Sequence, residues 1–189
     1  MAPKSGQQGV AVVTGSSSGI GYETALALAR NGFTTFATVR DLGKAGQLAS
    51  IASKENLPIQ VLQLDVTDDV SVKKAIKQVL DKAGRIDLVV NNAGYGLTGA
   101  FEDLSIDEIR SVYDTNFFGV IRVTQAVLPT MRSQGIGRIV NISSAAGRVA
   151  YPGASAYVST KYALEGLTES MAYELEPFGI RVILVEPVS

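Results

Sequence analysis

Tyr157 and Lys161 are the residues of this chain best suited to move a proton. They form a Tyr-x-x-x-Lys pattern inside a segment with helical spacing, so their side chains lie on one face, one turn apart. A nearby ammonium stabilises a phenolate, and a phenol assisted in this way can protonate an alkoxide or deprotonate an alcohol. We predict that Tyr157 is a general acid/base tuned by Lys161. The alternative is a Tyr and Lys pair on a helix surface.

Ser144 is the predicted partner of this pair. It follows a predicted strand over residues 138–142 and precedes the segment that carries Tyr157. A hydroxyl group at this edge of a sheet can donate a hydrogen bond to a carbonyl and stabilise a developing oxyanion. A capping or turn serine is the alternative interpretation.

The composition excludes other kinds of site. The 189 residues include no Cys and no His, which excludes disulfides, thiolate nucleophiles, Ser-His-Asp triads and His-ligated zinc. The net charge is -1 and the basic residues are scattered, so we expect no nucleic-acid partner. We also expect no metal site, because Cys and His are absent. No apolar run approaches the ~18 residues of a membrane span. We expect a cytoplasmic protein that acts on small molecules.

Short β-branched runs alternate with helix-length segments along the chain. The predicted strands are 10–14, 33–39, 59–64, 86–90, 138–142 and 181–185. The predicted helices are 20–31, 41–55, 68–83, 105–132 and 155–176. This alternation predicts an α/β fold of Rossmann type, a doubly wound parallel sheet in the order 3-2-1-4-5-6 with helices on both faces. We interpret residues 1–189 as a single dinucleotide-binding domain.

A glycine-rich turn follows the first predicted strand and opens the first helix. Residues 14–21 read T-G-x-x-x-G-x-G, a variant of the dinucleotide fingerprint. The unpaired N–H groups of the helix start face any anion in the turn, and glycine lets the backbone approach a pyrophosphate. An ordinary Gly/Ser-rich turn is the alternative. The predicted cofactor contacts here are Gly15, Ser17, Ser18, Gly19, Ile20 and Gly21.

Arg40 follows the second predicted strand, where a cofactor's adenosine ribose would lie. A cation at this place favours a 2′-phosphate, and an acid favours free ribose hydroxyls. Asp41 is the available acid, but it is better placed to cap the next helix. We therefore predict NADP(H) in preference to NAD, which stays possible, with Arg40 as the phosphate contact. A solvated arginine without a ligand is the alternative.

Further cofactor contacts are predicted where later strands end. Parallel strands present their carboxyl ends at one edge of the sheet, where open α/β sheets bind ligands. Asp65 can accept a hydrogen bond from an adenine amino group, and small residues let the chain pass close to the adenosine. Turn chemistry explains the Asn-Ala-Gly sequence equally well. The contacts predicted at these ends are Asp65, Val66, Asn92, Ala93, Gly94 and Pro187.

Together these residues resemble the short-chain dehydrogenase/reductase family in its compact, non-extended branch. Residues 14–21 and 91–94, then Asn116, Ser144 and the pair Tyr157 and Lys161, match the family motifs in order over nearly the whole chain. The resemblance implies an oxidoreductase that transfers hydride between NADP(H) and a carbonyl or secondary alcohol.

The resemblance also implies a role for each matching residue. Tyr157 would be the general acid/base and Ser144 would polarise the substrate oxygen. Lys161 would hold the nicotinamide ribose, and Asn116, in the long fourth helix, would hold a water that links Lys161 to solvent. A helix-interior amide is the alternative interpretation of Asn116.

The same resemblance extends to substrate and assembly. Residues 157–178 are similar to hydroxysteroid and retinol dehydrogenase-like members that act on lipophilic alcohols or ketones, and family members commonly form homodimers or homotetramers. The family usually continues after the sixth strand with a substrate lid and a seventh strand, whereas this sequence ends shortly after Pro187. We expect a C-terminally incomplete domain that lacks both.

Two other functions remain open. The first is an NADP-binding sensor, scaffold or inactive fragment without catalysis. The second is a sugar-nucleotide epimerase or dehydratase of the extended branch, which also uses a Tyr-x-x-x-Lys pair. The glycine spacing and the short chain favour the dehydrogenase over the epimerase.

Overall fold

The structure, a computed structural model that describes residues 9–188, is built on a parallel six-stranded sheet. The strand order is β3-β2-β1-β4-β5-β6, which confirms the predicted doubly wound topology. Each of the predicted strands is present, with bounds shifted by one or two residues. The strands are β1 (Val10–Val13), β2 (Thr34–Val39), β3 (Ile59–Gln63), β4 (Leu88–Asn91), β5 (Gly137–Ile142) and β6 (Ile180–Val185).

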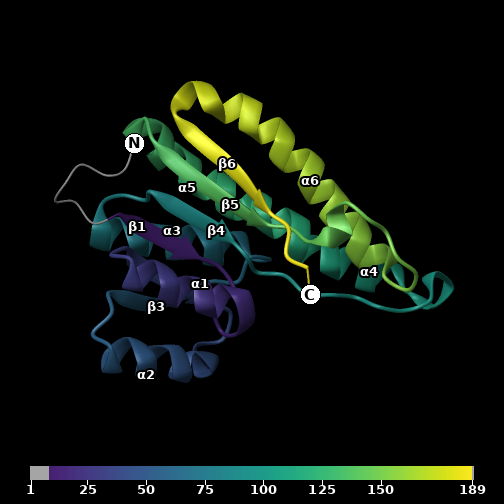
Figure 1. Ribbon diagram of the computed structural model, residues 1–189, viewed down its shortest axis with the longest axis horizontal. Helices are drawn as coiled ribbons and strands as arrows, with labels where there is room; N and C mark the ends of the chain where they lie inside the picture. Colours follow the sequence, from purple (N-terminus) through teal and green to yellow (C-terminus); the bar gives the residue numbers. More distant parts are fainter. Residues whose placement is uncertain (1–8, 189) are drawn as a thin grey trace.

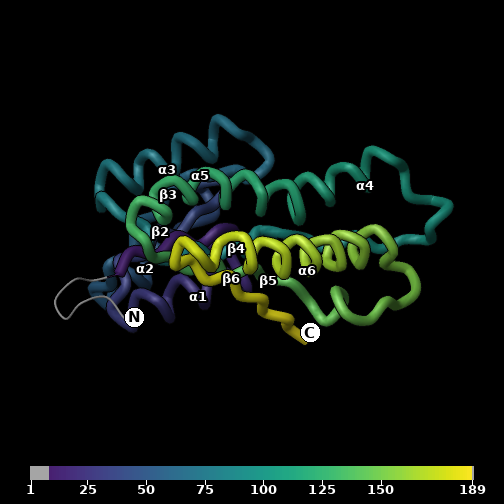
Figure 2. The backbone as a smooth tube through the Cα atoms, turned by 90° about the horizontal axis from the view of Figure 1, so that it is seen from above, coloured from purple at the N-terminus to yellow at the C-terminus, as the bar shows by residue number. Residues whose placement is uncertain are grey.

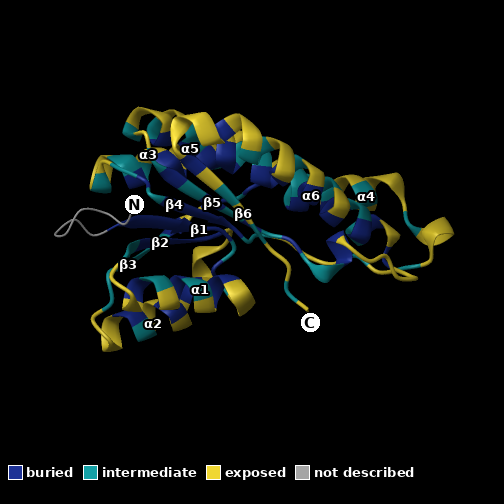
Figure 3. Cartoon of the chain, turned by 45° about the horizontal axis from the view of Figure 1, so that its top comes forward, coloured by how far each residue is buried: buried dark blue, intermediate teal, exposed yellow. Residues whose placement is uncertain are grey.

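Helices cover both faces of this sheet (Figures 1 and 3). In Figure 3, α1 and α2 lie on one face, and α3, α5 and α6 lie on the other. The α-helices are α1 (Gly19–Arg30), α2 (Gly46–Lys54), α3 (Asp69–Ala83), α4 (Ile106–Tyr113), α5 (Gly119–Gln134) and α6 (Ser155–Leu175). Short turns of 3₁₀ helix are η1 (Leu42–Ala45), η2 (Phe101–Asp103), η4 (Ala145–Gly147) and η5 (Glu176–Phe178).

Strand β1 shows why a strand of this sheet is a continuous apolar run in the sequence, without alternating polar residues. Every residue of the strand is buried, because helices cover both sides of the sheet. Successive side chains point to opposite faces, so Val12 packs with Phe36 in the cluster that includes α3 and α5 residues. Val13 packs with Leu26 of α1 in the other cluster. The two apolar clusters, one on each face, hold the strands in place, so that their carboxyl ends lie together at one edge of the sheet.

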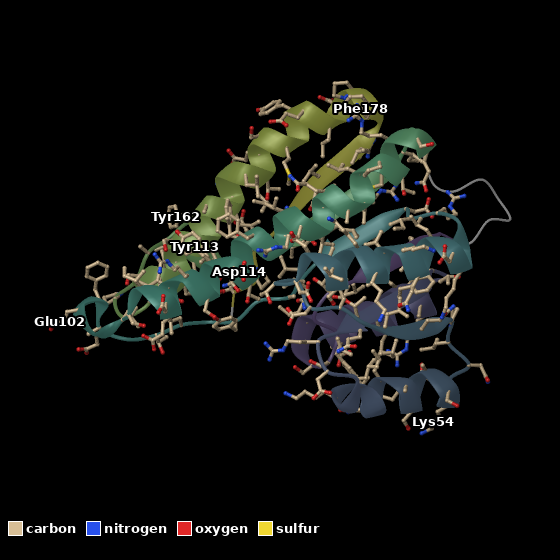
Figure 4. The ribbon with its side chains drawn as sticks, turned by 180° about the vertical axis from the view of Figure 1, so that it is seen from behind. Lys54, Glu102, Tyr113, Asp114, Tyr162 and Phe178 are labelled. Atoms are coloured by element: carbon tan, nitrogen blue, oxygen red, sulfur yellow. The ribbon has the colours of Figure 1, made fainter. Side chains whose placement is uncertain are left out.

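The predicted fourth helix, 105–132, is wrong as a single regular helix. The chain forms α4, then a π-helical segment η3 (Asp114–Phe118), and then α5, which continues to Gln134. A π turn has wider i→i+5 hydrogen bonding, and the spacing of apolar residues does not separate it from a regular turn. In Figure 4, Tyr113 and Asp114 mark the place where α4 passes into this segment.

The predicted helix over 41–55 also begins differently. Its first turn is the 3₁₀ turn η1, and α2 starts only at Gly46. The carboxylate of Asp41 accepts a hydrogen bond of 2.9 Å from the Gly43 N–H. Asp41 therefore caps the turn, as the sequence indicated, and its carboxylate is used for this purpose.

Helices α4 and α6 extend together beyond the sheet, at the side where the chain also reaches its C-terminal residues (Figure 2). They contact one another, and the first part of α6 also contacts η3 and η4. Among the described residues, no helix is long and apolar enough to cross a membrane. The extension places the first turns of α6 beside the carboxyl ends of β4 and β5.

Candidate active site

A groove of about 1040 Å³ runs along the carboxyl edge of the sheet. It contains every predicted cofactor and catalytic residue except Gly21 and Asn116, which are buried. The predicted residues that line it are Gly15, Ser17, Ser18, Gly19, Ile20, Arg40, Asp65, Val66, Asn92, Ala93, Gly94, Ser144, Tyr157, Lys161 and Pro187. Residues from seven separate loops or helix starts therefore meet in one cavity.

The glycine turn packs tightly against the end of β4. Gly15 has a φ of +68°, and a Cβ there would lie 2.8 Å from the Cα of Ala93. A Cβ on Gly21 would overlap the side-chain amide of Asn92 and the carbonyl oxygen of Gly15. Both positions need glycine because backbone and amide atoms, which cannot move cheaply, occupy the space of a side chain.

Thr14 and Asn92 join the turn to β4 by a reciprocal set of hydrogen bonds. The Thr14 hydroxyl oxygen accepts from the backbone N–H groups of Asn92 and Ala93, each at 3.0 Å. The Asn92 side chain donates to the carbonyl oxygens of Thr14 and Gly15 at 3.0 and 3.1 Å. Asn92, predicted as a cofactor contact, thus also braces the turn. Thr14 begins the T-G-x-x-x-G-x-G motif but was not predicted as a site residue, because the motif does not show that its side chain reaches the end of β4.

The start of α1 has no capping side chain, unlike the starts of α3 and α4. Ser18 makes no side-chain hydrogen bond to the helix, and the first turn contains no acidic residue. In contrast, Asp68 caps α3 and Ser105 caps α4 in a capping box with Glu108. The free N–H groups and the positive end of the helix dipole at α1 suit an anion in the groove.

Two cations lie at the far end of the groove from Tyr157. The guanidinium group of Arg40 is exposed and forms no ion pair with any residue that the structure describes. Lys44, in η1, lines the same end. Sequence reasoning missed Lys44 because it treated 41–55 as one helix, although a second cation one turn after Arg40 was a usable signal.

Asp65 forms part of the groove wall after β3. One of its carboxylate oxygens accepts hydrogen bonds from the backbone N–H and the hydroxyl group of Thr67, at 2.9 and 2.7 Å. These bonds fix the carboxylate at the groove. The backbone N–H of Asp65 donates a hydrogen bond of 2.9 Å to the hydroxyl oxygen of Ser71.

Lys161 is buried beneath Tyr157 at the other end of the groove. Only 7% of Lys161 is exposed, and its ammonium donates a hydrogen bond of 2.8 Å to the carbonyl oxygen of Ile142. The same nitrogen lies 5.7 Å from the centre of the Tyr157 ring. The structure therefore brings the predicted pair together on one face of α6, with the ammonium next to the ring.

Burial lowers the pKa of Lys161 from 10.5 to about 8, and the negative charge of Glu165 partly opposes this shift. A base whose pKa is lower in the folded state binds fewer protons there than in the unfolded chain. Folding stability therefore rises with pH between about 8 and 10.5, where only the unfolded lysine keeps its proton. Below this range the buried charge lowers stability by a constant amount.

Lys161→Met is expected to remove this dependence. Between about pH 8 and 10.5, the free energy of unfolding of the unsubstituted protein should rise relative to the variant, by up to roughly 3 kcal/mol. Urea unfolding of both proteins across this pH range measures the difference. Parallel curves would show that Lys161 titrates normally in the folded protein.

Ser144 lies between β5 and η4 in the groove. Its hydroxyl oxygen accepts a hydrogen bond of 3.1 Å from the Ala146 N–H and so caps η4. The cap uses a lone pair of the oxygen and leaves the hydroxyl hydrogen for another acceptor. The two interpretations of Ser144, a cap and a donor toward a substrate, are therefore compatible.

Asn116 lies in the π-helical segment η3 and is 1% exposed. Its amide donates to the carbonyl oxygen of Tyr95 at 2.9 Å and to the Thr160 hydroxyl at 3.3 Å. Its amide oxygen accepts from the Tyr95 N–H at 3.0 Å. Asn116 is thus neither a regular helix-interior amide nor open to the groove. It joins the loop after β4 to the residue before Lys161, and its role toward a water stays a prediction.

Comparison with known proteins identifies the family of the chain. The short chain dehydrogenase family matches residues 9–189. The uncharacterized oxidoreductase YusZ of Bacillus subtilis is 46% identical over 95% of this chain and 64% of its own length. Human 17-beta-hydroxysteroid dehydrogenase type 1 is 42% identical over 94% of this chain and 55% of its own length.

A solved structure shares the fold over most of both chains. A metagenomic short-chain oxidoreductase in complex with NADP superposes with a TM-score of 0.91 at 32% identity, over 96% of this chain and 82% of that one. The chain spans 55 to 64% of the length of the two curated relatives. The family match, the identities and the sheet order agree, and the chain belongs to the short-chain dehydrogenase family.

Proposed function

We propose that this chain transfers hydride between NADP(H) and a carbonyl or secondary alcohol, with Tyr157 as the general acid/base. The observation that carries the proposal is the single groove with an anion-binding turn and two cations at one end and Tyr157, Lys161 and Ser144 at the other. A dinucleotide bound along it would present its phosphates to α1 and its nicotinamide to Tyr157. When bound, the nicotinamide supplies or accepts the hydride.

The residues of the groove fit such a cofactor. The uncapped start of α1 and the tight glycine turn suit a pyrophosphate. Arg40 and Lys44 suit a 2′-phosphate, since Asp41 is already engaged as a cap. The NADP complex of the metagenomic relative supports this cofactor.

The proton is transferred at the other end of the groove, where Tyr157, Ser144 and Lys161 lie. In the reductive direction, the Tyr157 hydroxyl group gives its proton to the oxygen of the nascent alkoxide, and the Ser144 hydroxyl group donates a hydrogen bond to the same oxygen. Lys161 favours the phenolate that remains by its positive charge. In the oxidative direction the phenolate removes the proton from the alcohol.

We propose a lipophilic substrate for this end of the groove. Tyr95 and Tyr151 line it, and 42% and 50% of these residues are exposed. Their rings offer apolar surface in the same groove as Tyr157. The similarity to a 17-beta-hydroxysteroid dehydrogenase supports a substrate of this kind. A homodimer or homotetramer and a cytoplasmic location stay predictions from the sequence.

Replacing Arg40 by alanine tests the cofactor. A charge-assisted bond to phosphate contributes about 1.5–3 kcal/mol, so Arg40→Ala should weaken NADPH binding about tenfold to a hundredfold and leave NADH binding unchanged. Titration of the full chain with each nucleotide, followed by nucleotide fluorescence, gives both dissociation constants.

Arg110→Ala is the matched control, because Arg110 is an exposed arginine of α4, 76% of whose side chain is exposed, and it does not line this groove. It should bind both nucleotides like the unsubstituted protein. Equal affinity for NADPH and NADH, unaffected by Arg40→Ala, would refute Arg40 as the phosphate contact and the preference for NADP(H).

A further inference from the structure

Glu165 is a buried carboxylate that the proposed chemistry does not use. It lies on α6, one turn after Lys161, and is 5% exposed. Neither of its carboxylate oxygens has a hydrogen-bond partner within residues 9–188. Burying a charge without a partner is costly, so a nearby cation must compensate for it.

The compensating cation is Arg148, at the end of η4. One nitrogen of its guanidinium lies 3.1 Å from Glu165 and 3.0 Å from Glu186, which follows β6. Another lies 3.6 Å from Glu169, on the exposed side of α6. Arg148 thus joins the turn that begins at Ser144 to α6 and to the end of β6.

The turn itself rests directly on the Glu165 carboxylate. A Cβ on Gly147 would lie 2.9 Å from both Oε1 of Glu165 and the hydroxyl oxygen of Ser143. The Ser143 oxygen is also buried and has no hydrogen-bond partner among the described residues. The carboxylate and Ser143 therefore flank Gly147, and a change at Glu165 reaches Ser144 through one turn of chain.

Glu165 also acts on Lys161 by its charge. The charged groups around Glu165 are Arg148 from η4, Lys161 and Glu169 from its own helix, and Glu186 after β6. The negative charge of Glu165 raises the pKa of Lys161, against the larger effect of burial. The carboxylate thus helps Lys161 to keep its proton near neutral pH.

We infer that Glu165 is a positioning residue of the active site, which holds the Ser144 turn through Arg148 and lies one helical turn from Lys161 on α6. The role toward turnover rests on the function proposed above. The role toward Lys161 is a property of the folded chain and can be measured without substrate or cofactor.

Glu165→Gln tests the inference because it removes the charge and keeps the shape. In the full chain labelled with ¹³C-lysine, with the Lys161 signal assigned by Lys161→Arg, the titration midpoint of Lys161 should fall below that of the unsubstituted protein. The kcat for ketone reduction should fall about tenfold or more, with the dissociation constant for NADPH within about twofold. The pH at which kcat changes should move in the same direction as the midpoint.

Glu169→Gln is the matched control. It lies one turn further along α6 and faces the same arginine, but 61% of its side chain is exposed. It should leave the Lys161 midpoint and kcat near their original values. Arg148→Gln is a second test. It removes the link to the Ser144 turn, so kcat should fall. It also removes a positive charge near Lys161, so the titration midpoint of Lys161 should rise.

The outcomes separate the inference from the proposed function. An unchanged Lys161 midpoint in Glu165→Gln, or a fall in kcat shared equally by Glu169→Gln, overturns the role of Glu165. If Glu165→Gln does not fold, the inference is overturned when the titration midpoint of Lys161 fails to rise in Arg148→Gln. A protein that binds NADPH, reduces no ketone and still shows both midpoint shifts contradicts the proposed function alone.

Discussion

Tyr157→Phe is expected to lower the turnover of ketones and alcohols by about 10²–10⁴-fold, the usual contribution of a positioned acid/base. The substitution removes the hydroxyl group that gives or takes the proton and keeps the ring. That ring is half-buried on α6, with the Lys161 ammonium 5.7 Å from its centre. NADPH binding should change by less than about twofold, because phosphate and adenosine contacts lie at the other end of the groove.

Steady-state oxidation of NADPH with a panel of lipophilic ketones measures this loss. Tyr173→Phe is the matched control, since Tyr173 lies on the same helix and is 81% exposed. It should retain full activity. Turnover by Tyr157→Phe like that of the unsubstituted protein would remove Tyr157 from the mechanism. Loss of binding and activity together would point to a damaged fold.

Gly21→Ala is expected to reduce both stability and cofactor affinity. The added methyl group would overlap the Asn92 amide and the Gly15 carbonyl oxygen, which already hold each other in a hydrogen bond of 3.1 Å. Overpacking of this kind costs about 1–3 kcal/mol of folding stability. Displacing Asn92 also loosens the turn that faces the pyrophosphate, so NADPH affinity should fall at least about tenfold.

Urea unfolding and NADPH titration of the same samples give the two quantities. Gly166→Ala is the control, because Gly166 lies within α6 and nothing lies within 4 Å of the position of its Cβ. Alanine there should raise stability by about 1 kcal/mol and leave NADPH affinity unchanged. A Gly21→Ala protein as stable and as tightly binding as the unsubstituted protein would contradict the packing of the turn.

The sheet could be predicted from the sequence because its signals are local. Each strand is a short apolar run flanked by Gly, Asn, Asp or Pro, and right-handed crossovers leave few possible strand orders. The carboxyl ends of the strands then had to meet at one edge. This is why residues as distant in sequence as Gly15, Asp65 and Ser144 were expected in the same groove.

The π-helical segment could not be predicted in the same way. Asn116 was expected in a regular helix, because the apolar spacing over 105–132 fits one. Its place in η3 depends on hydrogen bonds to Tyr95 and Thr160, which come from other elements. Tertiary partners thus decided the local geometry at a predicted site residue.

The contacts around Glu165 were equally out of reach of the sequence. Glu165 lies in a helix with charged residues on many turns, and a glutamate there is usually exposed. Its burial depends on Gly147 and Arg148, which the chain brings back after β5. Neither residue belongs to a pattern with Glu165 that a single sequence could reveal.

Hydride transfer by this chain can be followed with NADPH that is deuterated at the transferable position. The full chain is mixed with this cofactor and a lipophilic ketone, and the product alcohol is analysed by mass spectrometry. We expect one deuterium on the carbinol carbon, and a loss of this product in Tyr157→Phe that matches its fall in turnover. Tight NADPH binding with no deuterium in any product would contradict the proposed hydride transfer and indicate a cofactor-binding protein without this chemistry.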